Sequence, residues 1–558
     1  MKQDANNTGG MKKSAGSSLL RGAAVLGIAA VLSKLIGTMQ KIPLQNIAGD
    51  GVFGIYNAVY PLYILILFLA TAGFPLVVSK FVSEQAVAGR HQEARRVLKV
   101  ASMVLMISGL LFFALLYWGA DWIAGLMGAA QTGPAIRSVS FALLFVPVMS
   151  ALRGYYQGYQ NMIPTAVSQV AEQTVRVATM FLLLLMFVHW QYGPALIAAG
   201  ATFGSVAGAV AGLLVMLWFW WKKPPSAEGG KQEVLGPSPH GYIAESSLGL
   251  IRRLLAYAIP ICLGTIAMPI LTLVDSFTVP RLLKLSGMNE SEALLGFGLY
   301  NHGLPLVQLV AMIASSMSAA LVPSIAEARW RGDKEALKSR TRTSLRLTWL
   351  IGMASSVGLA VLAEPINVML FKSSEGSWTM SILAFTALFS TLNIVASSVL
   401  QGFGAVAAPA LYLLAAAVVK IAGNIALVPL WGIDGAAAAA VAAYALAGLL
   451  ALAHALRATG VKPALGRAVI KLVLCTSLMI AAVLAVTHGL PALLGALRLS
   501  LPQRGMATAV ALAGVAAGAL AYALALVRLG VITAAELESI PKLGGKPLKL
   551  LRKFKLLQ

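Results

Sequence analysis

The sequence predicts an all-α integral membrane protein with about fourteen transmembrane helices. Hydrophobic residues make up 58% of its 558 residues and charged residues only 11%, against about 25% charged residues in ordinary soluble domains. Long apolar runs recur along the chain, and each approaches the roughly 20 residues that a membrane-spanning helix needs. A soluble protein of this size is therefore excluded.

The apolar runs form two groups separated by a polar segment at residues 222–247. This segment is rich in Pro, Gly and Ser, which is typical of a flexible linker. Six predicted spans precede it and eight follow it. They cover residues 17–45, 51–79, 97–119, 122–152, 163–189, 194–221, 253–280, 296–326, 344–363, 379–401, 407–429, 434–456, 468–488 and 505–529.

Lys and Arg are concentrated in alternate connections between the spans. Residues 327–346 hold seven of them, whereas the next connection holds only Lys372 beside Glu364 and Glu375. Because connections rich in Lys and Arg stay in the cytoplasm, we expect both termini there. The net charge is +23, and the basic residues that produce it lie between the apolar spans. This distribution favours anionic membrane lipids as partners and argues against nucleic acid.

Two blocks of sequence recur at a nearly constant offset. "LRGYYQGYQNMIPTAVSQVAEQTVRVA" and "VLQGFGAVAAPALYLLAAAVVKIAG" share a Gln-Gly pair, a proline and a basic residue, Arg176 or Lys420, 244 or 245 positions apart. "PLVVSKFVSEQAVAGRHQEARR" and "LVPSIAEARWRGDKEALKS" match at 242 or 243 positions. Two independent matches at one offset indicate a duplication.

The duplication predicts two pseudo-symmetric six-helix lobes. An even number of spans per repeat gives both lobes the same orientation, with a central cavity between them, which is the layout of a transporter. The predicted parts are an N-lobe (1–221), a cytoplasmic linker (222–247), a C-lobe (248–457), two further spans (458–530) and a basic amphipathic cytoplasmic tail (531–558).

Two lysines interrupt the first apolar run, in "SKLIGTMQKIP". Lys34 and Lys41 are seven positions apart, almost two helical turns, so they would project from nearly the same face. A cation inside a membrane marks a functional site unless it snorkels to an interface. Snorkelling competes equally with function for Lys41, and function is favoured for the deeper Lys34.

Other polar residues in the spans have two interpretations each. Asp275 would bind a coupling ion or pair with Lys34 or Arg281, and Arg281 itself would otherwise snorkel. Glu172 and Arg176 have the i, i+4 spacing of an intrahelical ion pair.

Further basic residues are candidates for the cavity or its mouths. Arg176 and its repeat partner Lys420 would face the cavity, and His302 would bind a ligand or cap its helix. Lys80 and Arg153 would gather a headgroup at the cytoplasmic entrance or only signal topology. Four glycines, Gly200, Gly204, Gly208 and Gly212, predict a smooth face for helix packing.

Catalytic and metal-binding motifs are absent from the sequence. It has no phosphate-binding Gly-Lys loop, metal-ligand cluster or nucleophile constellation, and its two cysteines, Cys262 and Cys475, lie in apolar segments. We therefore expect a transporter and not an enzyme, with neither metal nor cofactor.

Four stretches carry a resemblance to a known family. "GFPLVVSKFVSEQAVAGR", "LRGYYQGYQNMIPTAVSQVAEQTVRV", "ALVPSIAEA" and "PLWGIDGAAAA" resemble the MATE-like flippases of the multidrug/oligosaccharidyl-lipid/polysaccharide exporter superfamily. The likeness is greatest to its polysaccharide-biosynthesis branch, which includes stage V sporulation protein B and the MurJ-type lipid II flippases. It spans about residues 19–529.

This resemblance implies a bacterial plasma-membrane flippase for an undecaprenyl-pyrophosphate-linked saccharide, with lipid II the leading cargo. Basic residues of the first helix would line a cationic cavity. Lys34 stands where these flippases commonly have arginine, and the second basic position falls on Gln40 or Lys41. Lysine lacks the bidentate fork that suits phosphate. The energy source, whether sodium, protons or membrane potential, stays open, and cell-wall synthesis proteins are candidate partners.

Four alternatives compete with this hypothesis. The cargo could be a teichoic-acid, capsule or sporulation-specific unit, or the chain could be a multidrug antiporter, although the lysines disfavour cationic cargo. A glycosyltransferase would need a large outer loop with acid/base residues, and the predicted outer loops are short. A non-transporting scaffold for cell-wall or spore-coat assembly would tolerate replacement of Lys34 and Asp275.

Overall fold

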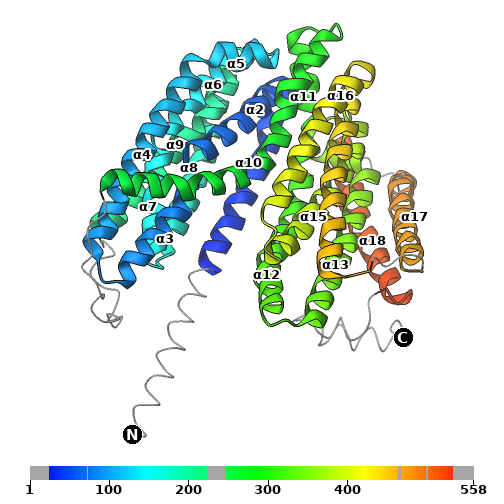
Figure 1. Cartoon of the computed structure of the whole chain (residues 1–558). Helices are drawn as coiled ribbons and strands as arrows, with labels where there is room; N and C mark the ends of the chain where they lie inside the picture. The colour runs from blue at the N-terminus through cyan, green and yellow to red at the C-terminus, as the bar shows by residue number, and fades with distance from the viewer. Residues whose placement is uncertain (1–23, 72, 223–245, 463–466, 498–500, 532–558) are drawn as a thin grey trace. The chain divides into compact units, whose positions relative to one another are not determined.

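The structure is a computed structural model that describes residues 24–71, 73–222, 246–462, 467–497 and 501–531. Every regular element in these ranges is an α-helix or a short 3-10 helix (Figure 1). The predicted all-α membrane fold is confirmed. Most of the predicted linker, and all of the predicted tail except its first residue, lie outside the described residues. Helix packing divides the chain into two compact units, one ending at Gly298 and the other starting at Leu299.

The first unit begins with a helix over residues 24–39 that ends at a turn at Gln40. Proline stands at the first or second position of α3, α6, α7 and α8, where its missing N–H has no helical partner to lose. The elements are α2 (Lys41–Thr71), α3 (Phe74–Val87), α4 (His91–Trp118), α5 (Ala120–Met127), η1 (Ala130–Thr132), α6 (Gly133–Ser140), η2 (Phe141–Leu144), α7 (Val146–Gly158), α8 (Ile163–His189), α9 (Pro194–Lys222), α10 (Ser247–Leu285) and α11 (Glu290–Tyr300).

The second unit is built around α15. Its buried residues Leu392, Val395 and Val399 pack with Ile325 of α12 and Ala451 of α16. The last two helices pack against each other, and they contact α13 and α14. The elements are α12 (Leu304–Trp330), α13 (Lys334–Val361), α14 (Ala363–Phe371), α15 (Ser377–Gly402), α16 (Ala407–Thr459), α17 (Arg467–Ala496) and α18 (Gln503–Arg528).

Two glycines break long helices where the sequence predicts the ends of spans. Gly49 (φ 80°, ψ 174°) interrupts α2, and Gly432 (φ 57°, ψ −134°) interrupts α16. Both conformations are essentially restricted to glycine. Among the described residues, eleven helical stretches are long and apolar enough to cross a membrane. Since two of them contain these breaks and α10 is not among the eleven, the number fourteen stays a prediction.

The turns of the two units confirm the internal repeat. α7 and α15 both end at the Gln-Gly pair, and a residue with positive φ follows two positions later, Gln160 (58°) or Gly404 (88°). The same backbone hydrogen bond closes each turn, from Asn161 N to Tyr156 O (3.0 Å) and from Ala405 N to Leu400 O (2.8 Å). Each residue of the first turn and its counterpart in the second turn are 244 positions apart, which is the predicted offset.

Helix packing within each unit repeats as well. A Cβ added at Gly158 would lie 2.7 Å from the Val82 Cβ of α3. One added at Gly402 would lie 2.8 Å from the Ile325 Cβ of α12. Val82 and Ile325 are 243 positions apart, so α7 packs on α3 as α15 packs on α12.

The compact units divide at a different point from the predicted lobes. α10 contacts α2, α3, α4 and α5, and α11 crosses α2 at Gly54, so both helices pack with the first unit. The sequence predicts that the second lobe begins at residue 248, because the polar linker ends there. The composition of a linker indicates that the chain is flexible there, but it does not indicate which helix the following segment packs against.

Candidate functional site

A cluster of cations and tyrosines lies inside the first unit, between α2 and α8. The Lys41 Nζ lies 6.0 Å from the centroid of the Tyr60 ring, and the Arg176 Cζ lies 4.9 Å from the same centroid. An Arg176 guanidinium N–H donates to the Tyr56 hydroxyl at 3.5 Å. Tyr56 and Tyr60 stack at 5.7 Å, and Tyr63 follows at 6.3 Å from Tyr60. We call these five residues the cationic cluster.

The break at Gly49 brings Lys41 to Tyr60. On a straight helix the nineteen positions between them would span about 28 Å, so the chain has to turn back between the two residues. Gln45 supports the turn, since its Nε2 donates to the Asp50 Oδ1 at 2.9 Å across the break. Beyond the break, the three tyrosines follow at i, i+4 and i+7 on one face of α2.

The glycine stripe of α9 positions α8. A Cβ added at Gly204 would lie 2.5 Å from the Arg176 carbonyl oxygen, and one at Gly208 would lie 2.6 Å from that of Glu172. All four glycines of the stripe are buried, which confirms the predicted packing face. Small residues at this contact let the two helix backbones approach closely.

Arg176 does not pair with Glu172, so that prediction is wrong. Glu172 instead accepts from Arg153 of α7 at 2.8 Å, and Arg153 also donates to the Ser168 hydroxyl at 2.8 Å. The Arg176 side chain turns to the tyrosines of α2, and i, i+4 spacing alone cannot decide between partners on two neighbouring helices. The carboxylate beside the cluster is therefore already neutralised.

The cluster carries an excess of positive charge. Lys41 is only 6% exposed and Arg176 is partly buried. Among the described residues, neither forms an ion pair with a carboxylate. Two cations held around one ring in an apolar bundle favour an anion between them, because burying unpaired charge is costly.

Two buried amide groups beside the cluster also have unused hydrogen-bonding capacity. Gln40 donates to the Tyr56 hydroxyl at 3.3 Å, but its Oε1 has no partner among the described residues. The Gln173 Nε2 likewise has none in this part of the chain, and it faces Gly37. Buried polar groups nearly always have hydrogen-bond partners. A ligand with hydroxyl or amide groups would supply partners to both the Gln40 Oε1 and the Gln173 Nε2.

Lys34 and Lys41 lie in different environments. Lys34 is exposed on the helix over residues 24–39, whereas its neighbour Ser33 is buried and donates to the Gln169 carbonyl of α8 at 3.5 Å. Lys41 lies beyond the turn at Gln40. The structure thus brings Gln40, Lys41 and Arg176 together and leaves Lys34 outside, and substrate binding by each stays a prediction.

Of the remaining candidates of the first unit, Asp275, Arg281 and Lys80 are not part of the cationic cluster, and Arg153 lies beside it. Asp275 is buried on α10, and Arg281, near the end of that helix, is exposed and packs against Gly128. Lys80, on α3, pairs with Glu84 at 4.0 Å. Arg153 lies beside the cluster through its ion pair with Glu172.

The last two candidates belong to the second unit. His302 is fully buried, its Nδ1 lies 2.8 Å from the Asn367 Oδ1, and its ring stacks on Phe371 at 4.1 Å. Lys420 is 2% exposed inside α16. These contacts account for the burial of His302 without a ligand.

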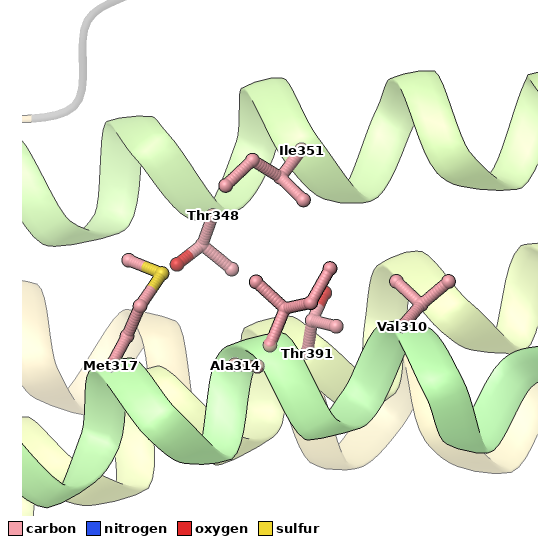
Figure 2. Close-up of a pocket in the computed structure, with 7 residues that line it drawn as sticks. Val310, Ala314, Met317, Thr348, Ile351 and Thr391 are labelled. Carbon is pink, nitrogen blue, oxygen red and sulfur yellow. The ribbon is translucent and has the colours of Figure 1, made fainter. Parts of the chain in front are cut away.

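A small cavity in the second unit is not large enough for a headgroup. Figure 2 shows it between α12, α13 and α15, lined by Met317, Thr348 and Thr391 among others. Its volume is about 10 Å³, which is near the smallest space that holds one water. Both threonine hydroxyls already donate to carbonyls of their own helices.

Sequence reasoning missed the tyrosines and Gln173. Their signal was present, because Tyr56, Tyr60 and Tyr63 repeat at helical spacing within a predicted span. Aromatic residues at that spacing more often belong to a core, and only the position of the two cations distinguishes this group.

Comparisons with known proteins place the chain among transport proteins of the membrane. Residues 19–329 match the family described as polysaccharide biosynthesis protein. The chain is 34% identical over 535 residues to "Uncharacterized membrane protein YabM" of Bacillus subtilis (strain 168), covering 96% of each protein. It is 30% identical over 446 residues to lipid II flippase MurJ of the same organism, covering 77% of this chain and 80% of that one.

Solved structures show the same fold. An inward closed structure of lipid II flippase MurJ gives a TM-score of 0.63 at 14% identity, covering 90% of this chain and 99% of that one. An inward-facing multidrug resistance MATE family transporter gives 0.63 at 14% identity, covering 79% and 98%. The fold is that of a multi-pass membrane transporter. The chain belongs to the polysaccharide biosynthesis protein family, and its relative lipid II flippase MurJ is a transport protein and not an enzyme.

Proposed function

We propose that the chain is a flippase that moves an undecaprenyl-pyrophosphate-linked saccharide from the inner to the outer leaflet by alternating access. Its preferred cargo would be the peptidoglycan precursor lipid II, and it would act in the bacterial plasma membrane with both termini in the cytoplasm. The family match supports a saccharide cargo, and the relatives named lipid II flippase MurJ and stage V sporulation protein B support a role in the cell envelope.

The observation that carries this proposal is the placement of Lys41 and Arg176 around the Tyr60 ring. A pyrophosphate brings at least two negative charges into the bilayer, and it needs fixed cations there. Arg176 offers a planar fork for phosphate oxygens, and Lys41 offers a point charge. The Arg153–Glu172 pair keeps the nearby carboxylate from competing for these cations.

The neutral groups of the site suit a saccharide. The Gln40 and Gln173 amides would exchange hydrogen bonds with hydroxyl or acetamido groups, which removes the cost of leaving them unsatisfied. The stacked rings of Tyr56 and Tyr60 present apolar surface beside polar hydroxyl groups.

The same cations would serve a teichoic-acid, capsule or sporulation-specific lipid-linked unit, because the anion is shared. A multidrug antiporter is less compatible, since Lys41 and Arg176 would repel a cationic drug. For energy coupling we propose Asp275 as the residue that responds to sodium, protons or the membrane potential, on the ground of its burial in α10.

Flipping of labelled lipid II in cells depleted of their own flippase tests the proposal. Wild type, Lys41→Gln, Arg176→Gln and Lys34→Gln are compared at matched expression, with the exposed Lys99→Gln of α4 as the control. We expect wild type and Lys99→Gln to restore flipping, and Lys41→Gln and Arg176→Gln to lose roughly tenfold or more, the effect of removing a charged hydrogen bond.

Each other outcome points to a different conclusion. A loss in Lys34→Gln as large as that in Lys41→Gln would return the first-helix lysine to the site. Failure of well-expressed wild type would move the assignment to another lipid-linked glycan, tested with that glycan. Full flipping activity of both Lys41→Gln and Arg176→Gln would refute the cationic site. Normal growth of the cell envelope with either variant, in the absence of any flipping by wild type, would indicate a scaffold.

A further inference from the structure

A second group of cations and aromatic rings lies between α3 and the start of α10. The Lys80 Nζ lies 3.8 Å from the centroid of the Tyr257 ring, and the Arg253 Cζ lies 4.6 Å from that of Phe81. The rings of Phe81 and Tyr257 meet edge to face at 5.6 Å. We call these four residues the α3–α10 cluster. It shares no residue with the cationic cluster.

The start of α10 has the geometry of an interfacial helix. α10 has 39 residues, so it is about 58 Å long, whereas a bilayer core is about 30 Å thick. Its first turns bury Leu250, Leu254 and Ala258 on one side. Figure 1 shows this part of α10 crossing its neighbouring helices at a steep angle instead of running along them. This length and this crossing angle are typical of a helix whose first turns lie at the level of the membrane interface.

The α3–α10 cluster is accessible from the surface. Tyr257 is 46% exposed, and the Lys80 side chain is 47% exposed. Apolar residues flank it on α10, with Leu248 at 76% exposure and Ile259 at 51%. Exposed tyrosine, cations and apolar side chains on one short segment are typical of a helix at the level of the lipid headgroups.

The surrounding charge favours an anion. Residues 80–99 and 247–259 hold seven Lys or Arg residues and two Glu. Glu84 lies 4.0 Å from Lys80 of the cluster and Glu93 lies 3.5 Å from Arg96, so the seven basic residues exceed the two acidic ones by five. Arg96 also donates to the Ser247 hydroxyl at 3.3 Å, which ties α4 to the first turn of α10.

We propose that the α3–α10 cluster is a binding site for the phosphate headgroup of an anionic phospholipid. The Lys80 ammonium group contacts the face of the Tyr257 ring on one side and can still donate hydrogen bonds from its other side. Arg253 adds a second cation that can bind the phosphate oxygens. Leu248 and Ile259 would contact the acyl chains. Lipid bound there would fix α3 to the start of α10, two segments more than 150 residues apart in sequence.

Native mass spectrometry of the purified full chain tests this site. The protein is titrated with phosphatidylglycerol or with phosphatidylcholine of the same acyl chains. We expect wild type to retain the anionic lipid preferentially, and Lys80→Gln/Arg253→Gln to bind it roughly 25-fold more weakly, from about fivefold for each cation at a membrane surface. Tyr257→Leu, which changes no charge, should lose part of the same preference.

Arg252→Gln is the matched control, because Arg252 is exposed on the same turn of α10 and lies outside the cluster. It is compared with the single variant Arg253→Gln, and an equal loss in the two would overturn the site and indicate only diffuse charge. Release of the lipid by millimolar inorganic phosphate would overturn the lipid assignment and indicate a site for free phosphate. Lys80→Gln alone keeps the test valid if the double variant does not fold, since Lys80 is half exposed.

Discussion

The Arg153 guanidinium and the Glu172 carboxylate lie 2.8 Å apart and join α7 to α8 one turn from Arg176. This ion pair decides the sign of the charge in the cationic cluster. Without Arg153, Glu172 would be free to pair with Arg176 at i, i+4 on the same helix, and that internal pair would compete with an anionic cargo.

The first prediction therefore concerns charge and its rescue. Arg153→Gln should lower the stability by about 1.5–3 kcal/mol, the usual contribution of a charged hydrogen bond, and reduce flipping several-fold. Adding Glu172→Gln should restore flipping, because it removes the competing carboxylate. Thermal unfolding and cellular flipping are measured for both variants. Equal flipping in the single and double variants would show that Glu172 does not compete with cargo.

A second prediction concerns the reversal of the chain at Gly49. Gly49→Ala forces a Cβ into a conformation that only glycine adopts readily, at a cost of about 1–3 kcal/mol, and it should separate Lys41 from Tyr60. Gly51→Ala is the matched control, since neither glycine has an atom within 4 Å of an added Cβ and only Gly49 has positive φ. We expect flipping to fall in the first variant and to stay at the wild-type level in the second.

The outcome separates backbone conformation from side-chain volume. If the two alanine variants behave alike in flipping and in thermal unfolding, the break at Gly49 does not position Lys41.

The repeat supplies a third prediction. Gly158→Ala and Gly402→Ala each place a Cβ within 2.7 Å of an atom on the neighbouring helix, so both should destabilise the protein by a similar amount, about 1–3 kcal/mol. Gly125→Ala is the control, because a Cβ there meets nothing within 4 Å, and it should be neutral or slightly stabilising. Thermal unfolding of the purified protein measures all three, and a large difference between the repeat partners would contradict equivalent packing.

The parts of the fold that depend on local sequence were predictable. The breaks at Gly49 and Gly432 fall between predicted spans, because a glycine within a short polar interruption marks a span end. The repeat was readable because both turns keep a Gln-Gly pair at the helix end, although the positive-φ residue that follows is Gln160 in one and Gly404 in the other. Each signal lies within a few neighbouring residues.

The parts that depend on tertiary packing were not predictable. Lys41 meets Tyr60 only because α2 turns back, and the degree of that turn is not encoded in hydrophobic periodicity. Glu172 takes Arg153 as its partner because α7 packs on α8, whereas sequence spacing favoured Arg176. Of the cationic cluster, only Lys41 and Arg176 were candidates from the sequence, as was Gln40 beside it, and none of the three tyrosines was.

A fourth prediction separates structure from ligand binding at His302. The His302 ring is fully buried, lies 2.8 Å from the Asn367 Oδ1 and stacks on Phe371. Its replacement by glutamine should therefore cost about 1–3 kcal/mol in unfolding free energy, because the buried Asn367 Oδ1 loses its hydrogen-bond partner. Flipping per folded molecule should stay near the wild-type level, because these contacts use the imidazole within the protein. His488→Gln, at an exposed position of α17, should leave both quantities unchanged. The measurement is thermal unfolding together with flipping normalised to folded protein. Reduced flipping at unchanged stability would restore His302 to the set of substrate-binding residues, since a side chain that only supports packing cannot lower transport without loosening the fold.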